Sequence, residues 1–244
     1  MIYVTVPGDT VSSISRQSGV PVWKIIYDNQ LGEEGKLTVG QALLLLKPQE
    51  SAEIREDLYV TGYAYPFIEP YVLEMAFPAL NELLVFSYGF TFEGELVPPI
   101  QDETWMIQLA WENGIEPMLV LTPFTQGVFN NQLIQTLVEE ESVRENVITN
   151  LLKVVEEKGY VGVDVDFEYV RAQNREGYAE FVGELRAAMN EKGYRVSVAL
   201  APKTSSDQKG LLYEGIDYAL LGEQADRLFL MTYEWGYSYG PPMA

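Results

Sequence analysis

From residue 58 onward, short runs of β-forming residues alternate with stretches of helical periodicity. The β-forming runs lie at 58–63, 83–88, 117–122, 161–167, 195–200 and 227–233. The helical stretches between them include 102–113, 142–158 and 176–192. Strands that alternate with helices usually pair in parallel through right-handed crossovers. The pattern therefore predicts an α/β fold, either an open doubly wound sheet or most of an eight-stranded barrel.

Two observations favour the (β/α)8 TIM-type barrel. No Gly-x-Gly-x-x-Gly or P-loop pattern follows an expected strand, which argues against a nucleotide-binding sheet. Polar and aromatic residues stand instead at the strand ends, where barrel enzymes carry out their chemistry. These residues are Tyr63, Tyr65, Ser87, Tyr88, Glu168 and Tyr233. Since only six strands precede Ala244, we expect a barrel truncated after its sixth strand, with open edges that favour self-association.

The run at 159–169 alternates apolar with acidic residues. Because side chains alternate along a strand, one face is expected to carry Val161, Val163, Val165 and Phe167. The other face would carry Gly162, Asp164, Asp166 and Glu168. Successive acids would lie roughly 6.5–7 Å apart, and burial beside like charges would raise a carboxyl pKa enough to supply a general acid. An amphipathic strand with solvated acids is the alternative, but both faces of a parallel sheet are normally covered.

Residues 1–47 form a separate pattern in the order strand, helix, helix, strand. A short strand at 3–6 is broken by Pro7-Gly8, and Asp9 or Thr10 can cap the helix that follows. The polar segment 48–56 has no periodicity and reads as a linker. The barrel is then expected to occupy residues 57–244.

The composition excludes several kinds of chemistry. The chain has no cysteine and no histidine, so Ser-His-Asp and Cys-His catalysis and zinc sites built on imidazole or thiolate are ruled out. A formal net charge of -20 repels phosphates and anionic lipids, so neither nucleic acid nor a membrane is expected as a partner. The N-terminus shows no signal-peptide pattern. The sequence specifies no oligomeric state.

The first segment resembles the LysM module. The matching positions are 6–11, Ile14, Val20, Ile25, Asn29 and 37–43. The resemblance implies a βααβ module that binds N-acetylglucosamine-containing glycans between its first strand–helix loop and its second helix–strand loop. The binding residues that it implies are Gly8, Asp9, Thr10, Asn29, Gln30 and Leu31. A purely local role is the alternative, with Asp9 and Thr10 as a helix cap and Asn29 as a helix stop.

The acidic run resembles the signature of glycoside hydrolase family 18, in which three acids alternate along the fourth barrel strand. The run 231–233 also resembles a family motif on the sixth strand. Three departures stand out: Val161 replaces a usual aspartate, Glu234 replaces another, and 119–124 lacks the small-residue motif of the third strand. Together with the LysM module, the chain is similar to bacterial spore-germination glycosidases of the YaaH/SleL type, which act on spore cortex peptidoglycan.

The resemblance implies substrate-assisted hydrolysis with retention at the anomeric carbon. Glu168 would protonate the leaving oxygen while the acetamide oxygen of the substrate attacks. Asp166 would hold the acetamide N–H, Asp164 would tune Asp166, and Tyr233 would donate to the acetamide oxygen. Aromatic candidates for sugar stacking are Tyr63, Tyr65, Tyr88, Phe90 and Trp235. No cofactor is expected.

Two other functions are compatible with the sequence. One is a non-catalytic cell-wall or spore-coat protein that binds peptidoglycan or chitin. The other is a hydrolase whose acids ligate Mg²⁺ or Ca²⁺, although no other strand end offers a matching carboxylate, so we expect no metal site. The sequence does not separate cortex peptidoglycan from chitin, or endo from exo cleavage. The expected location is the spore coat or cortex, or the cell wall.

Overall fold

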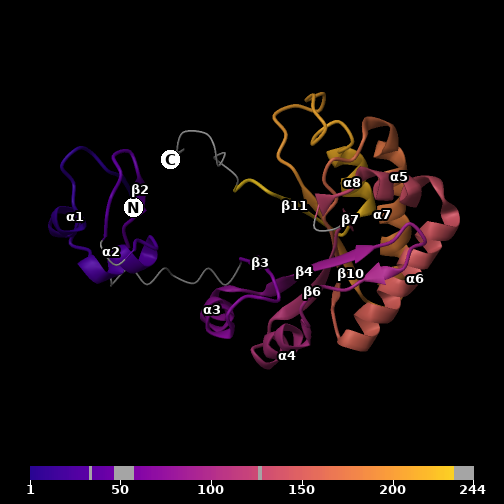
Figure 1. Cartoon of the computed structure of the whole chain (residues 1–244), viewed down its shortest axis with the longest axis horizontal. Helices are drawn as coiled ribbons and strands as arrows, with labels where there is room; N and C mark the ends of the chain where they lie inside the picture. The colour runs from indigo at the N-terminus through magenta and orange to yellow at the C-terminus, as the bar shows by residue number, and fades with distance from the viewer. Residues whose placement is uncertain (33–34, 47–57, 126–127, 234–244) are drawn as a thin grey trace. The chain divides into compact units, whose positions relative to one another are not determined.

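The computed structural model describes residues 1–32, 35–46, 58–125 and 128–233 (Figure 1). They divide into two compact units, one built on residues 1–58 and the other on residues 59–232. The linker expected at 48–56 lies outside the described residues. No helix in the described ranges is long and apolar enough to cross a membrane.

The smaller unit has the expected βααβ order. Its elements are β1 (Ile2–Val4), α1 (Val11–Ser18), α2 (Val22–Asp28) and β2 (Ala42–Leu44). The two strands pair antiparallel, and the helices pack a small core against them. Thr10 caps α1 through a capping box with Ser13, and Gly19 ends the helix in the left-handed region at φ 76°.

The larger unit alternates strands with helices. Its strands are β3 (Thr61–Ala64), β4 (Glu82–Phe90), β5 (Leu96–Val97), β6 (Glu116–Leu121), β7 (Phe124–Thr125), β8 (Val128–Phe129), β9 (Gly162–Val165), β10 (Arg195–Leu200) and β11 (Arg227–Leu230). Its α-helices are α3 (Pro70–Ala76), α4 (Thr104–Glu112), α5 (Asn131–Glu139), α6 (Glu141–Lys158), α7 (Arg175–Asn190) and α8 (Tyr218–Gln224). Single 3₁₀ turns, η1 (Phe77–Ala79) and η2 (Ala172–Asn174), precede β4 and α7.

The six expected strands form one parallel sheet in chain order. The order is β3-β4-β6-β9-β10-β11, with β5 added antiparallel to β4. A doubly wound sheet would reverse its strand order at a switch point, whereas the wall of a barrel keeps chain order. The sheet is therefore a curled half-barrel, as expected of a truncated TIM-type barrel. Within the described residues, β3 and β11 are its two edges.

The two faces of the sheet carry separate apolar layers. On the outer face, α6 packs against β9 and α7 packs against β10. The face predicted for α7 is buried at Tyr178, Phe181, Leu185 and Met189. The inner layer consists of Leu84, Met118 and Val120, with Tyr63, Phe86 and Val161 packed against it. Val161 was expected on the outer face; it precedes the first residue of β9, and the strict alternation of side chains applies only within the strand.

The N-terminal ends of the strands are joined by four charged residues and one hydroxyl group, here called the basal cluster: Glu82, Glu116, Arg195, Arg227 and Thr61. The Glu82 carboxylate is 2% exposed. It accepts hydrogen bonds from Thr61 Oγ1 at 3.0 Å, Arg195 Nη2 at 3.1 Å and Arg227 Nη2 at 3.3 Å. Arg195 also donates to Glu116 at 2.6 Å. Because these residues come from five strands, a single buried carboxylate connects both edges of the half-barrel.

We predict that Glu82→Ala destabilises the protein by about 2–3 kcal/mol, because it leaves two arginines without their buried partner. The measurement is urea unfolding followed by circular dichroism. Lys153→Ala is the control, since its pair with Glu157 is 4.0 Å long and both side chains are more than 60% exposed. Lys153→Ala is expected to lower the free energy of unfolding by less than about 0.5 kcal/mol. Equal destabilisation by both substitutions would contradict the role of the basal cluster.

Candidate active site

The three acids of the 159–169 run lie in order at the C-terminal end of β9. Asp164 is inside the strand, Asp166 directly follows it, and Glu168 lies two residues further. The backbone N–H of Asp166 donates to the Leu121 carbonyl at 3.0 Å, so pairing with β6 continues one residue past the strand. Asp164 is 0% exposed, Asp166 is 6% exposed and Glu168 is partly exposed. The acids therefore run from the interior toward solvent.

Asp164 is held by two hydroxyl groups from other strands. Tyr63 on β3 donates to Oδ2 at 2.7 Å, and Ser197 on β10 donates to Oδ1 at 2.5 Å. Burial raises the pKa of Asp164 to about 6, although both hydrogen bonds act in the opposite direction. Because its pKa is about 6, Asp164 changes its protonation state close to neutral pH.

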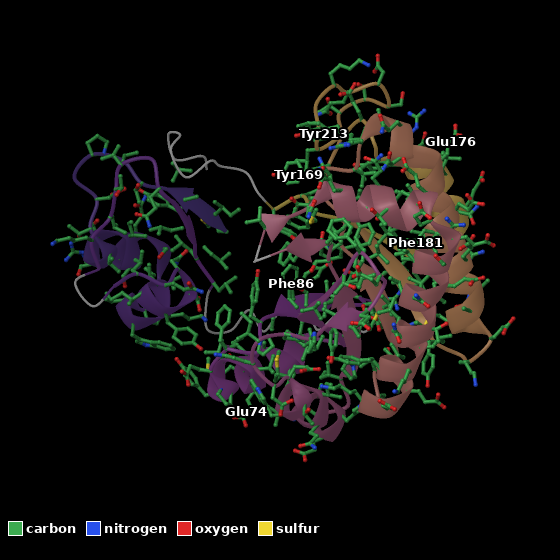
Figure 2. All side chains as sticks on the ribbon, turned by 45° about the vertical axis from the view of Figure 1, so that its right-hand side comes forward. Glu74, Phe86, Tyr169, Glu176, Phe181 and Tyr213 are labelled. Atoms are coloured by element: carbon green, nitrogen blue, oxygen red, sulfur yellow. The ribbon has the colours of Figure 1, made fainter. Side chains whose placement is uncertain are left out.

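The outer face of the same segment fixes the position of the acids. Val163 and Val165 are buried among the helices. Beyond the strand, Phe167 stacks on Tyr178, with ring centroids 5.4 Å apart, and on Phe181 at 5.9 Å. Figure 2 labels Phe181 on the helix-covered side of the sheet. Phe167 lies between Asp166 and Glu168 in the chain, so its packing on α7 anchors the backbone of both acids.

Two of the aromatic candidates in the described part of the chain lie near the acids: Tyr63, and Tyr65, whose pKa is raised by burial and by the charge of Asp166. Tyr63 reaches Asp164 through its hydroxyl, and its ring packs in the inner layer. Tyr65, two residues further on, is 47% exposed. Tyr233 lies three residues beyond β11 and is exposed, so its role toward the acetamide stays a prediction. Trp235 lies outside the described residues.

Tyr88 and Phe90 were expected to stack on sugars, but the structure buries both on the outer face. Tyr88 is 3% exposed and donates to Glu103 at 2.5 Å, and Phe90 stacks on Phe167 at 5.8 Å. The reason is a shift in the register between β4 and β6, located between Val85 and Tyr88. Such an irregularity turns the following side chains to the other face. These rings therefore present no face to a glycan.

An aromatic row that the sequence did not reveal crosses the C-terminal ends of the strands. Successive ring centroids lie 4.6 to 6.0 Å apart. The row consists of Phe67, Tyr65, Phe86, Phe124, Phe129 and Tyr169. Figure 2 labels Phe86 and Tyr169 of this row. The row gives this end of the half-barrel apolar ring faces of the kind that sugar rings contact.

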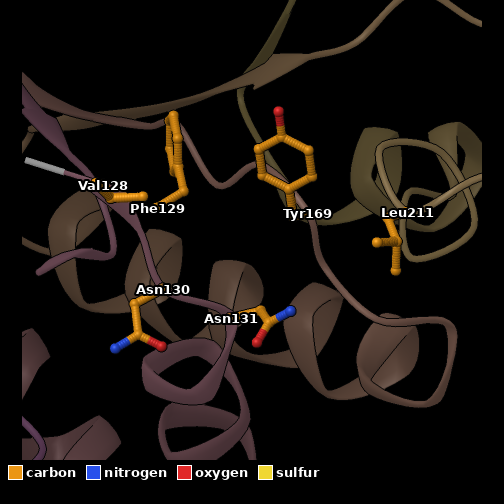
Figure 3. A pocket seen from close by; sticks show the side chains of 6 residues that line it. All are labelled: Val128, Phe129, Asn130, Asn131, Tyr169 and Leu211. Atoms are coloured by element: carbon orange, nitrogen blue, oxygen red, sulfur yellow. The ribbon is translucent and has the colours of Figure 1, made fainter.

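A pocket lies at the Tyr169 end of this row (Figure 3). Its lining residues are Val128, Phe129, Asn130, Asn131, Tyr169 and Leu211. Tyr169 directly follows Glu168, and its backbone adopts φ 59°, a left-handed conformation that is uncommon outside glycine. The Phe129 and Tyr169 rings meet edge to face at 6.0 Å. We call this cavity the Tyr169 pocket.

The smaller unit has a cavity of its own, and two of the residues implied by the LysM resemblance line it. Asp9 and Thr10 form one wall, and residues 35–37 form another. Both also serve the local fold: Thr10 caps α1, and Asp9 accepts hydrogen bonds from Tyr3 and Val6 at 2.8 Å each. Asp9 and Thr10 therefore stabilise the start of α1 and line the cavity at the same time.

The other implied LysM residues, Gly8 on the first side of the expected groove and Asn29, Gln30 and Leu31 on the second, are not among the residues that line this cavity. Asn29 Nδ2 donates to the Leu44 carbonyl at 2.9 Å, and its Oδ1 accepts from the Leu44 N–H at 2.6 Å. The Asn29 amide thus joins the end of α2 to β2 like an additional strand residue.

Sequence reasoning missed Ser197, one of the two hydroxyl partners of Asp164. A usable signal was present: Ser197 is the polar residue in the middle of a run of apolar ones, Val196 to Leu200, on a strand buried on both faces. In the register with β9 it lies directly opposite Asp164. A lone hydroxyl beside a buried acid is the expected way to satisfy a carboxylate.

Comparison with known proteins agrees with this architecture. Residues 3–45 match the LysM domain family, and residues 127–241 match the family described as Glycosyl hydrolases family 18. The chain is 37% identical over 170 residues to the cortical fragment-lytic enzyme of Bacillus subtilis (strain 168), over 69% of this chain and 39% of that protein.

Solved structures extend the likeness. The crystal structure of the Bacillus cereus spore cortex-lytic enzyme SleL matches with a TM-score of 0.73 and 31% identity, over 100% of this chain and 56% of that chain. The chitinase of Chromobacterium violaceum ATCC 12472 matches with a TM-score of 0.67 and 22% identity, over 74% of this chain and 57% of that chain, which shows the fold alone. The chain spans about half the length of these relatives or less.

The half-barrel, with its acids at the end of the fourth strand, has the fold of a (β/α)8 barrel. Its residues 127–241 are similar to glycosyl hydrolases of family 18, and residues 3–45 are similar to LysM domains.

We predict that Asp164 makes the stability of the protein fall as the pH rises from about 4 to 6. Because its folded-state pKa of about 6 exceeds the ordinary value of 3.8, folding takes up a proton in this window. Asp164→Asn removes this dependence. The free energy of unfolding of the variant minus that of wild type should therefore be up to about 3 kcal/mol larger at pH 7 than at pH 4. Urea unfolding across this range measures it.

The control for this experiment is Glu145→Gln, which removes an exposed carboxylate of α6. It should leave the slope of stability against pH as in wild type. An Asp164→Asn profile parallel to that of wild type would show that Asp164 does not take up the proton.

Proposed function

We propose that this protein hydrolyses a polymer of N-acetylated amino sugars, with spore cortex peptidoglycan as its substrate. The observation that carries the proposal is the ordered burial of three acids at the C-terminal end of β9, with the innermost acid held by Tyr63 and Ser197. This is the end of a barrel where enzymes of this fold act. The names of the cortical fragment-lytic and cortex-lytic relatives support the choice of substrate and a location in the spore cortex or cell wall.

In this proposal, Glu168 is the general acid, because it is the member of the series that solvent and a substrate can reach. It donates a proton to the glycosidic oxygen as the bond to the leaving sugar breaks. A carboxyl group serves as an acid near neutral pH when its neighbours disfavour its charged form. Asp166, nearly buried and two residues before Glu168 in the chain, is the neighbouring acid in this proposal.

The attacking group is the acetamide oxygen of the substrate, which forms a ring with the anomeric carbon and is later displaced by water with net retention. Asp166 accepts a hydrogen bond from the acetamide N–H and orients it for attack. Asp164, whose pKa of about 6 lets it carry or release a proton, sets the charge that Asp166 experiences. Tyr233 would donate its hydroxyl to the acetamide oxygen.

The smaller unit is proposed to hold the glycan at its own cavity, with Asp9 and Thr10 on one side and residues 35–37 on the other. This revises the set implied by the resemblance, because the Asn29 amide is committed to β2. We propose residues 1–47 as the glycan-binding module and residues 57–244 as the part of the chain that carries the acids.

The second candidate is a glycan-binding protein without catalytic activity. The observation that favours it is the cavity of the smaller unit, which offers a glycan site that does not involve the acids. For the metal-dependent alternative, no group of three or more acids suited to a metal ion occurs in the described part of the chain.

We predict that Glu168→Gln lowers the rate of cortex-fragment hydrolysis by at least about 10³-fold while retention on insoluble peptidoglycan is unchanged, because the amide keeps the shape but donates no proton. Release of reducing ends measures turnover, and co-sedimentation measures binding. The control is Glu180→Gln on the exposed side of α7, which should keep full activity. Near-normal hydrolysis by Glu168→Gln would remove Glu168 from the role of acid; binding with no hydrolysis in wild type would favour the second candidate.

Substrate assistance makes a separate prediction. A glycan with free amino groups lacks the attacking oxygen, so its hydrolysis should be slower than that of the N-acetylated form by at least about 10³-fold, comparable to the loss of an intramolecular nucleophile. Matched acetylated and deacetylated oligosaccharides are compared at saturating concentration. Comparable rates for the two would exclude the acetamide as the nucleophile.

A further inference from the structure

Two polar side chains at the start of α7 are buried without a hydrogen-bond partner among the described residues. They are the hydroxyl of Tyr178 and the Nδ2 end of the Asn174 amide. Tyr178 is 0% exposed and Asn174 is 3% exposed. Leaving a buried donor unpaired is costly, so a native fold retains such groups where a bound water molecule, an ion or a function requires them.

The two groups lie on the same side of the helix. Asn174 directly precedes the first residue of α7, and Tyr178 lies four residues further along the chain. Residues with this spacing share a helix face, with Cβ atoms about 5–6 Å apart. A long side chain in a helix leans toward the N-terminus, so the Tyr178 side chain extends over the turn that begins at Asn174. One small molecule can therefore contact both groups.

The Tyr178 ring connects this pair to the acids. It stacks on Phe167, with an interplanar angle of 17°, and Phe167 lies between Asp166 and Glu168 in the chain. Burial raises the pKa of the Tyr178 hydroxyl, and the charges of Asp166 and then of Asp164 raise it further. Of these two carboxylates, Asp166 therefore has the stronger effect on the hydroxyl.

The chemistry of the two groups indicates what they hold. A hydroxyl and an amide N–H can both donate to one acceptor atom. The charge of Asp166 disfavours an anion beside them, and the N–H disfavours a metal cation. A water molecule accepts from both donors and keeps two hydrogens to donate, one of which suits a carboxylate oxygen.

We propose that Tyr178 and Asn174 hold one buried water molecule, which donates a hydrogen bond to the carboxylate of Asp166. Both are positioning residues, because they act on the reaction through Asp166. The water stabilises the ionised form of Asp166, which is the form that accepts a hydrogen bond from the acetamide N–H of the substrate. The effect on the reaction rests on the proposed function, whereas the water site does not.

Titratable groups face Asp166 from its own segment, from the end of β3 and from α7. They are Asp164, Glu168, Tyr65 and Tyr178. The neighbouring strands β6 and β10 contribute the Leu121 carbonyl, which accepts from the Asp166 N–H, and the Ser197 hydroxyl, which donates to Asp164. A substitution of the Tyr178 hydroxyl alone leaves all the other groups in place, so it isolates the contribution of the water.

A crystal structure of the whole chain tests the water site. We expect one ordered water molecule within about 2.7–3.2 Å of Tyr178 Oη, Asn174 Nδ2 and a carboxylate oxygen of Asp166. In Tyr178→Phe, the water or its contact with Asp166 should be lost while the stack on Phe167 remains. A direct contact between the hydroxyl and a protein acceptor, or a water molecule that does not reach Asp166, would overturn the proposal.

Carbon NMR of labelled aspartate carboxyl groups tests the effect on Asp166 without any substrate. In Tyr178→Phe, the pH at which Asp166 ionises should rise by about 0.5–1 pH unit, because its ionised form loses a hydrogen bond. Thermal stability should be unchanged, because the ring is kept. Asn174→Ala should act in the same direction, since the Asn174 side chain makes no cap hydrogen bond to α7.

Tyr160→Phe is the matched control. Tyr160 is also buried, at 2% exposed, but its hydroxyl lies 3.5 Å from Glu103. This variant should leave the ionisation of Asp166 as in wild type. The same shift in Tyr160→Phe and Tyr178→Phe, or none in Tyr178→Phe, would show that Tyr178 does not position a donor for Asp166.

Hydrolysis of cortex fragments separates this inference from the proposed function. The acidic limb of kcat/KM against pH should move to higher pH in Tyr178→Phe by the amount that the carboxyl titration gives. If wild type is active and the limb stays in place, the effect on the reaction fails while the proposed function stands. If the titration shifts as expected and wild type hydrolyses nothing, the water site stands and the proposed function fails.

Discussion

Burying the Asp164 carboxylate inside the half-barrel is the constraint on which the arrangement of the site depends. An unpartnered carboxyl group in this position would cost several kcal/mol. Tyr63 from β3 and Ser197 from β10 supply the two hydrogen bonds that offset this cost. Because these strands are not neighbours of each other, the interaction also holds the curvature of the sheet. The more exposed acids, Asp166 and Glu168, lie in the segment that directly follows the same strand.

The two ends of the sheet divide the charged residues between them. At the N-terminal end, Glu82 forms ion pairs with Arg195 and Arg227, so its charge is neutralised within the fold. Through Arg227 and Thr61 it also connects both edge strands. At the C-terminal end, the described residues place no arginine or lysine in an ion pair with Asp164, and its charge is controlled by burial and hydroxyl groups. The first arrangement serves stability, and the second leaves a carboxyl group able to change its protonation state.

The smaller unit shows how one residue can match a family pattern for a structural reason. Asn29 fits the family at the end of the second helix, and the structure uses its amide to pair with the backbone of Leu44. Asp9 and Thr10 fit the family as well; they line a cavity while they also organise the first turn of α1. A matching position therefore identifies the module more securely than it identifies a ligand contact.

The sequence by itself determined the features that depend on periodicity and on neighbouring residues: the six parallel strands, the buried face of α7, the cap at Thr10 and the order of Asp164, Asp166 and Glu168 at the end of β9. Tertiary structure decided what depends on register between distant strands. The shift between β4 and β6 buried Tyr88, the pairing of β9 with β10 brought Ser197 to Asp164, and the hairpin β7–β8 brought Phe129 to Tyr169. A local pattern fixes which face a side chain takes within one strand, but a one-residue change in pairing reverses that face, and only the assembled sheet sets the pairing.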